Sequence, residues 1–224
     1  MNILLGVTGS VAAIKLPEMV DTLGELGKVK VVATPSAIQI VDRIKNYDLW
    51  RAKGPGFSEE QQTVLREIDS IGMIKRAQVC RIIEDRDEWM WQKIGDPVLH
   101  IDLKDWADVL VIAPLTANTL AKMAYGLADS LLTCICRAWP PPRFPRDLFT
   151  PAEGGKPIVV APAMNTDMWE HPHTMRAFKT LWGIYGENLT LVSPVEKKLA
   201  CGTTGIGAMA APHVIAEYVR KAVV

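Results

Sequence analysis

The sequence predicts a doubly wound α/β fold, in which helices cover both faces of a parallel β-sheet. Two observations carry this prediction. Short apolar runs rich in β-branched residues alternate with segments of helical periodicity along the chain. Such runs are typical of strands buried on both faces, as they are in parallel sheets. In these folds a ligand binds beyond the carboxyl ends of the strands, at the point where the strand order reverses.

The individual elements follow in order from the N-terminus. The first strand is expected at 2–7, and a helical pattern covers 11–26, where Pro17 implies a kink or a short first segment. The later strands are expected at 28–35, 107–114, 156–163 and 189–195, and the later helices at 117–132, 167–186 and 213–224.

Two segments interrupt this alternation. Residues 42–78 are polar and rich in charge, and we expect an insertion with some helix of its own. Residues 140–155 hold five prolines and two glycines, a composition that excludes regular secondary structure and predicts a surface loop. Because no internal repeat or second domain boundary is visible, the chain is interpreted as one domain over 1–224 with two insertions.

Composition narrows the class of protein. Lys plus Arg and Asp plus Glu number 25 each, so the formal net charge is zero, and no basic face points to nucleic acid. No apolar run approaches a membrane span, and the first residues enter a strand without a basic leader. We therefore expect a soluble cytoplasmic protein that binds neither nucleic acid nor a membrane.

The four cysteines show no metal-binding or disulfide pattern. None forms a CxxC pair, and no His or Cys cluster has zinc-finger spacing, so no metal is expected. Cys134 and Cys136 lie in the apolar run "LLTCICRAW" and are expected to be small buried core residues. Cys201 differs, because glycine and threonine fill the next four positions. The stretch "KLACGTTGIGAM", 198–209, therefore predicts a loop that presents this cysteine.

The motif "GVTGSVAA", 6–13, places a Gly-Ser turn between the first strand and the first helix. Backbone N–H groups and a hydroxyl at a helix start favour an anion. The motif is neither GxGxxG nor a Walker sequence, so a single phosphate is favoured over a nucleoside triphosphate. The alternative is a tight turn in which Ser10 is only the N-cap of the helix.

Two further strand ends carry polar residues. Thr116, Asn118 and Thr119 cluster where the helix after strand 107–114 begins, and capping alone accounts for only one of the three. Asn165 follows strand 156–163 and offers a donor and an acceptor, which suits a carboxylate or an amide, although it too could be an N-cap.

His100 is the histidine with the most informative context. It alternates with Leu99 and Ile101, a pattern that indicates a strand, and a lone histidine there is more often structural than catalytic. The other three histidines have no special context.

Taken together, these motifs resemble the flavin-dependent cysteine decarboxylase family. The resemblance is carried by "GVTGSVAAIKLP", "DEWMWQKIGDPVLHIDLKDWADVLVIAPLTANTLAKMAYGLADSLLTCICRAW", "APAMNTDMWEHP" and "KKLACGTTGIGAMA". These stretches run nearly end to end, and the resemblance covers about two thirds of the chain. It implies a flavodoxin-like fold, an FMN cofactor, and trimers whose active sites lie at subunit interfaces and draw on neighbouring chains. For the cofactor it implies contacts from Gly9, Ser10, Val11, Thr34, Ser36, Thr116, Ala117, Asn118, Thr119 and Ala163.

The resemblance also implies the reaction. The substrate would be 4′-phosphopantothenoylcysteine, decarboxylated to 4′-phosphopantetheine in coenzyme A synthesis. His100 matches the family's essential histidine, and Asn165 matches the asparagine that holds the substrate carboxylate. Cys201 matches a cysteine on a flap over the substrate that supplies the final proton, with Lys198 and Ala200 beside it.

One departure and three alternatives accompany this resemblance. The family's loop usually reads Cys-Gly-Asp, whereas residue 203 here is Thr. One alternative is a non-catalytic, halotolerance-type flavoprotein that regulates a protein phosphatase, although relatives of that kind often carry an acidic tail and this sequence shows none. The others are a decarboxylase of a peptide's C-terminal cysteine and a flavin prenyltransferase. The residues do not separate peptidyl from phosphopantothenoyl substrates.

Overall fold

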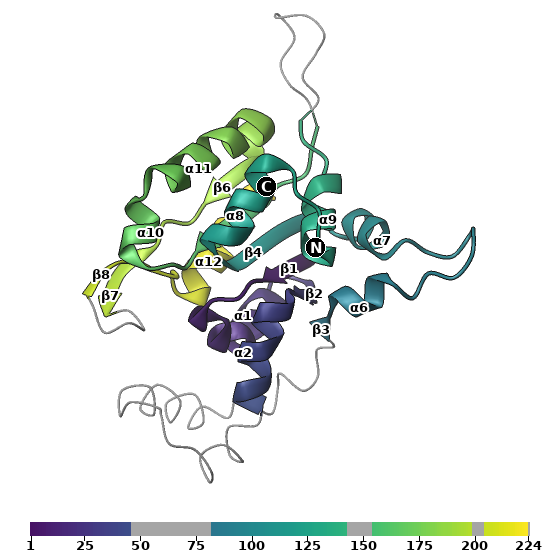
Figure 1. The fold of residues 1–224 in the computed structure, drawn as a ribbon, viewed down its shortest axis with the longest axis horizontal. Coiled ribbons are helices and arrows are strands. Elements are labelled where there is room, and N and C mark those ends of the chain that lie inside the picture. Colours follow the sequence, from purple (N-terminus) through teal and green to yellow (C-terminus); the bar gives the residue numbers. More distant parts are fainter. Residues whose placement is uncertain (46–81, 143–153, 199–203, 224) are drawn as a thin grey trace, which may run out of the picture.

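A six-stranded parallel sheet forms the centre of the molecule (Figure 1). The computed structural model describes residues 1–45, 82–142, 154–198 and 204–223. The strand order is β3-β2-β1-β4-β5-β6, and every neighbouring pair is parallel. The doubly wound, flavodoxin-like prediction is therefore confirmed. The strands are β1 (Asn2–Val7), β2 (Lys28–Ala33), β3 (Ile82–Ile83), β4 (Val109–Leu115), β5 (Ile158–Pro162) and β6 (Leu189–Leu191).

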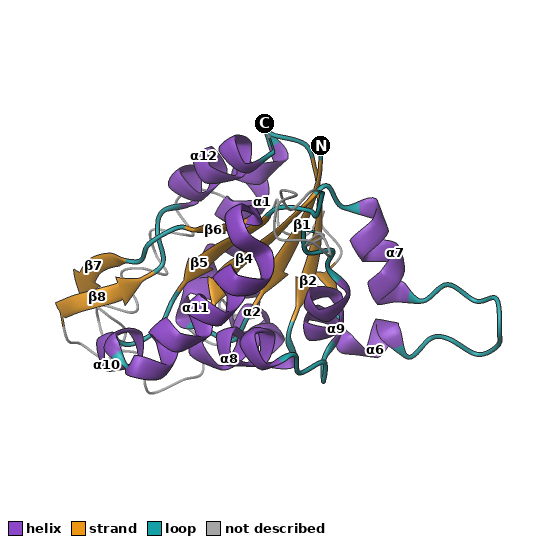
Figure 2. Ribbon diagram, turned by 90° about the horizontal axis from the view of Figure 1, so that it is seen from above, coloured by secondary structure: helices purple, strands orange, loops and turns teal. Residues whose placement is uncertain are grey.

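Helices cover both faces of this sheet, which gives three layers (Figure 2). Side chains alternate between the faces along each strand, so that Leu5 packs on one side and Leu4 on the other. The first face carries η1 (Val11–Lys15), α1 (Leu16–Gly24), α2 (Pro35–Lys45) and α12 (Pro212–Ala222). The second carries α7 (Leu99–Trp106), α8 (Ala117–Tyr125), α9 (Leu131–Ala138) and α11 (Pro172–Tyr185).

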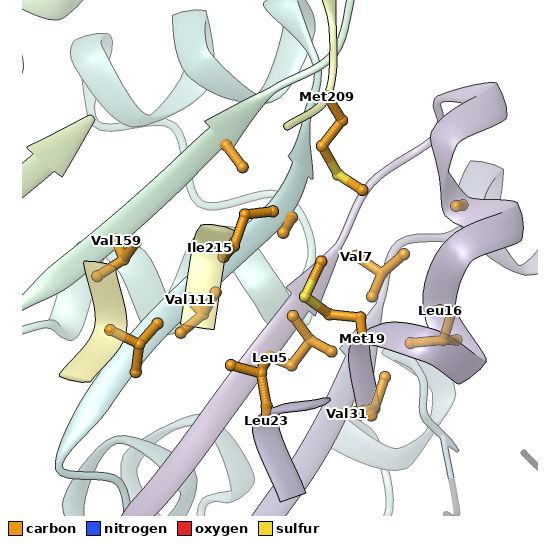
Figure 3. Packing of buried hydrophobic residues seen from close by; sticks show 14 of the residues in the cluster. Leu5, Val7, Leu16, Met19, Leu23, Val31, Val111, Val159, Met209 and Ile215 are labelled. Atoms are coloured by element: carbon orange, nitrogen blue, oxygen red, sulfur yellow. The ribbon is translucent and has the colours of Figure 1, made fainter. Parts of the chain in front are cut away.

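The core of the first face shows how the strands and helices interlock (Figure 3). Leu5 and Val111 come from neighbouring strands, and Met19 and Ile215 come from α1 and α12. All four side chains are almost fully buried. Truncation of a core leucine such as Leu5 to alanine costs about 2–5 kcal/mol of stability. This rigid layer fixes the strand ends on which the site is built.

The segment around His100 is a helix, so the strand predicted there is wrong. In α7, Leu99 and Leu103 lie one helical turn apart and both pack into the core of the second face. Contacts from distant segments stabilise the helix at both ends. Lys156 Nζ donates to the carbonyls of Lys104 and Ala107, both at 2.8 Å, at its C-terminal end.

Two predicted helices are each divided in two. The helix expected over 117–132 ends at Gly126, which adopts a left-handed conformation with φ of 72°, and α9 restarts behind a capping box of Ser130 and Thr133. The helix expected over 167–186 becomes α10 (Thr166–Glu170) and α11, separated at His171. Glycine at a helix end and proline at a helix start account for these breaks.

A separate antiparallel hairpin stands apart from the main sheet (Figure 2). It consists of β7 (Val195–Lys198) and β8 (Thr204–Ala208), with Lys198 paired to Thr204. The loop predicted over 198–209 is therefore wrong for 204–208, which form a strand.

The remaining predictions concern the cysteines and the insertions. Cys136 is buried as expected, whereas Cys134 is half-exposed. Of the insertion expected at 42–78, residues 42–45 form the end of α2, and residues 46–78 lie outside the described part of the chain. Most of 140–155 lies outside it as well.

Among the residues that the structure describes, no helix is both long enough and apolar enough to span a bilayer.

Candidate functional site

The predicted cofactor residues gather at one edge of the sheet, beyond the carboxyl ends of β1, β2, β4 and β5. From β1 the chain proceeds outward to β2 and β3, and then returns to β4 on the opposite side of β1. The strand order therefore reverses between β1 and β4. The turns after these two strands flank the position where doubly wound folds bind their ligands.

Thr8 joins the two turns at this reversal. Its side chain is fully buried. Thr8 Oγ1 donates to the carbonyl of Pro114 at 2.7 Å and accepts from the backbone N–H of Thr116 at 3.0 Å. Thr8 is absent from the residues predicted above, and its signal in the sequence is a hydroxyl directly after an apolar strand.

The turn after β2 lies against the turn after β1. The N–H of Thr34 donates to the carbonyl of Val7 at 3.0 Å, and Thr34 Oγ1 lies 3.2 Å from Ser36 Oγ. A Cβ at Gly9 would come within 2.3 Å of Ser36 Oγ, so only glycine permits this approach. Ser10 Oγ accepts from the N–H of Ala12 at 3.4 Å. The N-cap role is therefore confirmed for Ser10, and the two turns form one hydroxyl-bearing surface.

The predicted cofactor residues in the turn after β4 lie in different environments. Thr116 is the N-cap of α8, because its Oγ1 accepts from the N–H of Thr119 at 3.3 Å. Thr116 Oγ1 also donates to Thr119 Oγ1 at 3.2 Å, and Thr119 is buried. Asn118 is exposed and Ala117 is half-exposed. Capping accounts for Thr116 alone, as predicted, and leaves Asn118 directed to the surface at the start of α8.

The turn after β5 brings Asn165 next to the hairpin. The N–H of Ala163, which is itself buried, donates to the carbonyl of Leu115 at 3.0 Å. Asn165 caps α10, with its Oδ1 accepting from the N–H of Asp167 at 2.8 Å. The N–H of Met164 donates to the carbonyl of Gly207 in β8 at 3.0 Å.

Two glycines of β8 permit the hairpin to approach the Asn165 turn so closely. A Cβ at Gly205 would lie 2.4 Å from Thr166 Oγ1, and a Cβ at Gly207 would lie 2.2 Å from the carbonyl oxygen of Met164. Gly207 also adopts a φ of 146°, which side chains disfavour. These glycines resemble a loop in sequence, yet they serve close packing of a strand.

The hairpin also locates the predicted cysteine loop in part. Lys198 is the last residue of β7, and Ala200 and Cys201 lie outside the described residues, between β7 and β8. The strand that follows these residues, β8, packs against the turn that holds Asn165.

His100 lies elsewhere. It is the second residue of α7, whereas Asn165 precedes α10, and α7 and α10 lie on opposite sides of the molecule in both views (Figures 1 and 2). Within a single chain the structure therefore does not bring His100 and Asn165 together.

The immediate partner of His100 is Glu88, at the end of the short helix α6 (Asp85–Glu88). Glu88 Oε1 lies 2.5 Å from His100 Nδ1, and Glu88 Oε2 accepts from the backbone N–H of His100 at 3.0 Å. Sequence reasoning missed Glu88, because it lies twelve residues before the histidine.

The side chains and helix starts at this edge of the sheet determine which ligand it can bind. The turns offer hydroxyls from Ser10, Thr34 and Ser36 and the starts of η1 and α2, an arrangement that suits a phosphate group. Val11 is exposed beside them and offers an apolar surface. In the described part of the chain, no group of three or more His, Cys, Asp or Glu side chains could hold a metal ion.

Comparison with known proteins agrees with this geometry. The family described as Flavoprotein matches residues 1–224. The chain is 42% identical over 220 residues to a probable phosphopantothenoylcysteine decarboxylase of Arabidopsis thaliana, an alignment that covers 98% of this chain and 87% of the relative.

Two solved structures are similar as well. One is a cysteine-to-serine mutant of a PPC decarboxylase complexed with pantothenoylaminoethenethiol, with a TM-score of 0.72 and 40% identity over 98% of this chain and 96% of the other. The second is the FMN binding protein AtHal3, with a TM-score of 0.69 and 41% identity over 98% and 95% of the two chains. The chain therefore belongs to the flavoprotein family, among relatives named phosphopantothenoylcysteine decarboxylase.

Proposed function

We propose that this chain is an FMN-dependent decarboxylase of 4′-phosphopantothenoylcysteine that acts in coenzyme A synthesis in the cytoplasm. The observation that carries the proposal is the conjunction of the family match with a hydroxyl-lined sheet edge at the strand-order reversal. Relatives at about 42% identity carry the name of this activity.

The described residues fit FMN at this edge. Ser10, Thr34 and Ser36 would hold the phosphate group with their hydroxyls and neighbouring N–H groups. Asn118 at the start of α8 and Val11 beside η1 would contact the rest of the cofactor. When bound, FMN supplies a two-electron oxidant that later returns its electrons to the product.

The chemistry of the substrate explains why a redox cofactor serves a decarboxylation. The α-carbon of an N-acylcysteine has no adjacent electron sink, so its carboxylate cannot leave directly. Oxidation of the thiol-bearing carbon to a thioaldehyde creates that sink, CO₂ leaves, and reduction of the resulting enethiol completes a redox-neutral cycle.

The side chains have separate roles in this cycle. Asn165 orients the substrate carboxylate, with Lys198 and Ala200 beside the substrate. His100 acts in the oxidation and decarboxylation steps by positioning or proton transfer. Cys201 donates the final proton as a thiol.

We propose further that the active form is a homotrimer whose sites are shared between chains. His100 belongs to α7 and Asn165 caps α10, and these two helices lie on opposite sides of the chain (Figure 1). A site that uses both residues therefore needs two copies. The loop before His100 supports this arrangement, because Trp89 and Ile94 in it are 83% and 95% exposed. Large apolar side chains so exposed are typical of a surface that another chain covers.

A first experiment tests the activity itself. The purified protein should take up FMN, with oxidised-flavin absorbance, and release CO₂ from 4′-phosphopantothenoylcysteine. A peptide with a C-terminal cysteine serves as the comparison substrate. Faster turnover of the peptide would replace the proposed substrate, and a protein that never binds FMN would overturn the proposal as a whole. Binding of FMN without turnover of either substrate would favour the non-catalytic alternative.

A second experiment tests the shared site. His100→Asn and Asn165→Asp chains, each inactive alone, are co-expressed with different tags and purified as mixed assemblies. Since half of the chains keep each residue, random mixing restores about a quarter of the sites. A control mixture of His100→Asn with the double variant restores none. Failure of the first mixture to exceed this control would show that both residues act within one chain.

A further inference from the structure

We propose that Glu88 is the positioning residue of His100: its carboxylate holds the imidazole in the tautomer with hydrogen on Nδ1 and leaves Nε2 to face the substrate. The proposal rests on the catalytic role of His100 in the proposed function. It adds a residue to which sequence analysis gave no role.

Both carboxylate oxygens of Glu88 contact His100. Glu88 Oε1 lies 2.5 Å from the ring Nδ1 of His100, and Oε2 accepts from its backbone N–H at 3.0 Å. An ionised carboxylate can only accept hydrogen bonds, so the hydrogen between Oε1 and Nδ1 belongs to the ring. In a neutral imidazole the second nitrogen, Nε2, then carries a lone pair and is the atom available for proton transfer.

The Glu88 carboxylate is held in place by the hydrogen bonds of its own helix, α6. Glu88 ends α6, which begins with a capping box in which the N–H of Glu84 donates to Asp87 Oδ2 at 2.8 Å. Asp85 Oδ1, in the same helix, accepts from the N–H of Leu131 at the start of α9, at 2.9 Å. The side chains of Glu88 and His100 are only 16% and 25% exposed. Little freedom therefore remains for the Glu88 carboxylate to turn away from the ring.

The position of His100 is fixed in the same way, by the contacts of α7. Leu103 of α7 is buried in the core of the second face. Lys156 binds the carbonyls at the opposite end of the helix. With α7 fixed along its length, the contact with Glu88 determines the rotation of the imidazole. A carboxylate that orients a histidine in this way fixes its tautomer.

The test separates positioning from folding. Glu88→Gln keeps the shape of the side chain but removes its charge, and the amide can present its NH₂ to Nδ1. We expect kcat to fall by about tenfold or more, with KM, FMN uptake and melting temperature near wild type. Glu88→Asp keeps the charge and should recover part of the lost kcat. The control is Glu217→Gln, an exposed glutamate of α12 on the opposite face of the sheet, which should keep the wild-type kcat.

A spectroscopic measurement completes the test without turnover. In ¹⁵N-histidine NMR spectra of the FMN-free protein at a pH where His100 is neutral, the His100 signals, identified by their loss in His100→Asn, should report hydrogen on Nδ1. In Glu88→Gln they should shift toward hydrogen on Nε2. Hydrogen on Nε2 in the wild type, or a Glu88→Gln enzyme with wild-type kcat, would overturn the proposal. Because the spectra do not depend on decarboxylation, failure of the proposed function would leave this result readable.

Discussion

The backbone N–H of Thr116 donates a 3.0 Å hydrogen bond to Thr8 Oγ1, across 108 residues of sequence. The same buried hydroxyl donates to the carbonyl of Pro114 at 2.7 Å. One side chain thus joins the two turns between which the strand order reverses. The relative position of these two turns, and with it the geometry of the proposed FMN site, therefore depends on this pair.

Replacement of Thr8 by valine should weaken the contact between the turns after β1 and β4. Valine keeps the shape of threonine but leaves the N–H of Thr116 without its acceptor, and an unsatisfied buried group costs about 1–3 kcal/mol. We expect that loss in the free energy of unfolding, measured by chemical denaturation, together with weaker FMN binding, measured by flavin fluorescence. Thr8→Ser restores the hydroxyl and should recover most of both. Equal FMN affinity in Thr8→Val and wild type would show that the link does not shape the site.

The β8 glycines predict a second set of effects. Gly205→Ala places a Cβ against Thr166 Oγ1, and Gly207→Ala places one against the Met164 carbonyl oxygen. Both should raise KM for the substrate and leave FMN affinity unchanged, because the hairpin moves away from Asn165 while the phosphate-binding turns stay. Steady-state kinetics and flavin titration distinguish these two quantities.

A rescue experiment refines this prediction. Thr166 Oγ1 is buried and has no hydrogen-bond partner among the described residues, so Thr166→Ala removes the obstacle at little cost. It should restore Gly205→Ala but not Gly207→Ala, whose obstacle is backbone. Gly183→Ala is the control, since nothing lies within 4 Å of its Cβ position. Rescue of both variants, or of neither, would contradict the packing described.

Stability at alkaline pH should reflect two buried groups on the second face. Burial raises the pKa of the Cys136 thiol from 9.0 to about 12 and that of the Tyr185 hydroxyl from 10.0 to about 12. Between pH 9 and 12 the unfolded chain therefore loses protons that the native chain keeps. The free energy of unfolding then falls as pH rises, by at most about 1.4 kcal/mol per pH unit for each group.

The variants Cys136→Ala and Tyr185→Phe isolate this effect. Each removes one of the two groups, so each should flatten the decline of the unfolding free energy across that range. Tyr185→Phe also loses the bond from its hydroxyl to the Cys136 carbonyl at 3.1 Å and should start from lower stability at neutral pH. A decline as steep as in the wild type in both variants would assign the effect to other groups.

Sequence alone predicted the features that depend on local chemistry. The buried strands and the turn after β1 followed from residue type and spacing, as did N-cap positions for Ser10, for Asn165 and for one of the three polar residues after β4. The fold class followed from the alternation of strands and helices, which the sheet order confirms.

The features that depend on distant contacts could not be predicted in this way. The residues of α7 fit both a strand and a short helix, and the structure selects the helix through the core packing of Leu103, with Glu88 and Lys156 at its two ends. The strand β8 looked like a loop because its glycines have no intrinsic strand propensity. Their role appears only when Thr166 and Met164 lie against them.

The contact of Lys156 with the end of α7 has a consequence for chemical labelling. Its Nζ donates to the carbonyls of Lys104 and Ala107 at 2.8 Å and of Asp105 at 3.4 Å, so all three hydrogens are directed to oxygen. Acylating reagents must reach the amine nitrogen, and these three contacts obstruct that approach. Lys156 should therefore react more slowly than exposed lysines in the native protein and become reactive when α7 separates from the start of β5. Its acylation rate, followed by mass spectrometry, would therefore report whether the contact between Lys156 and α7, the helix that carries His100, is intact.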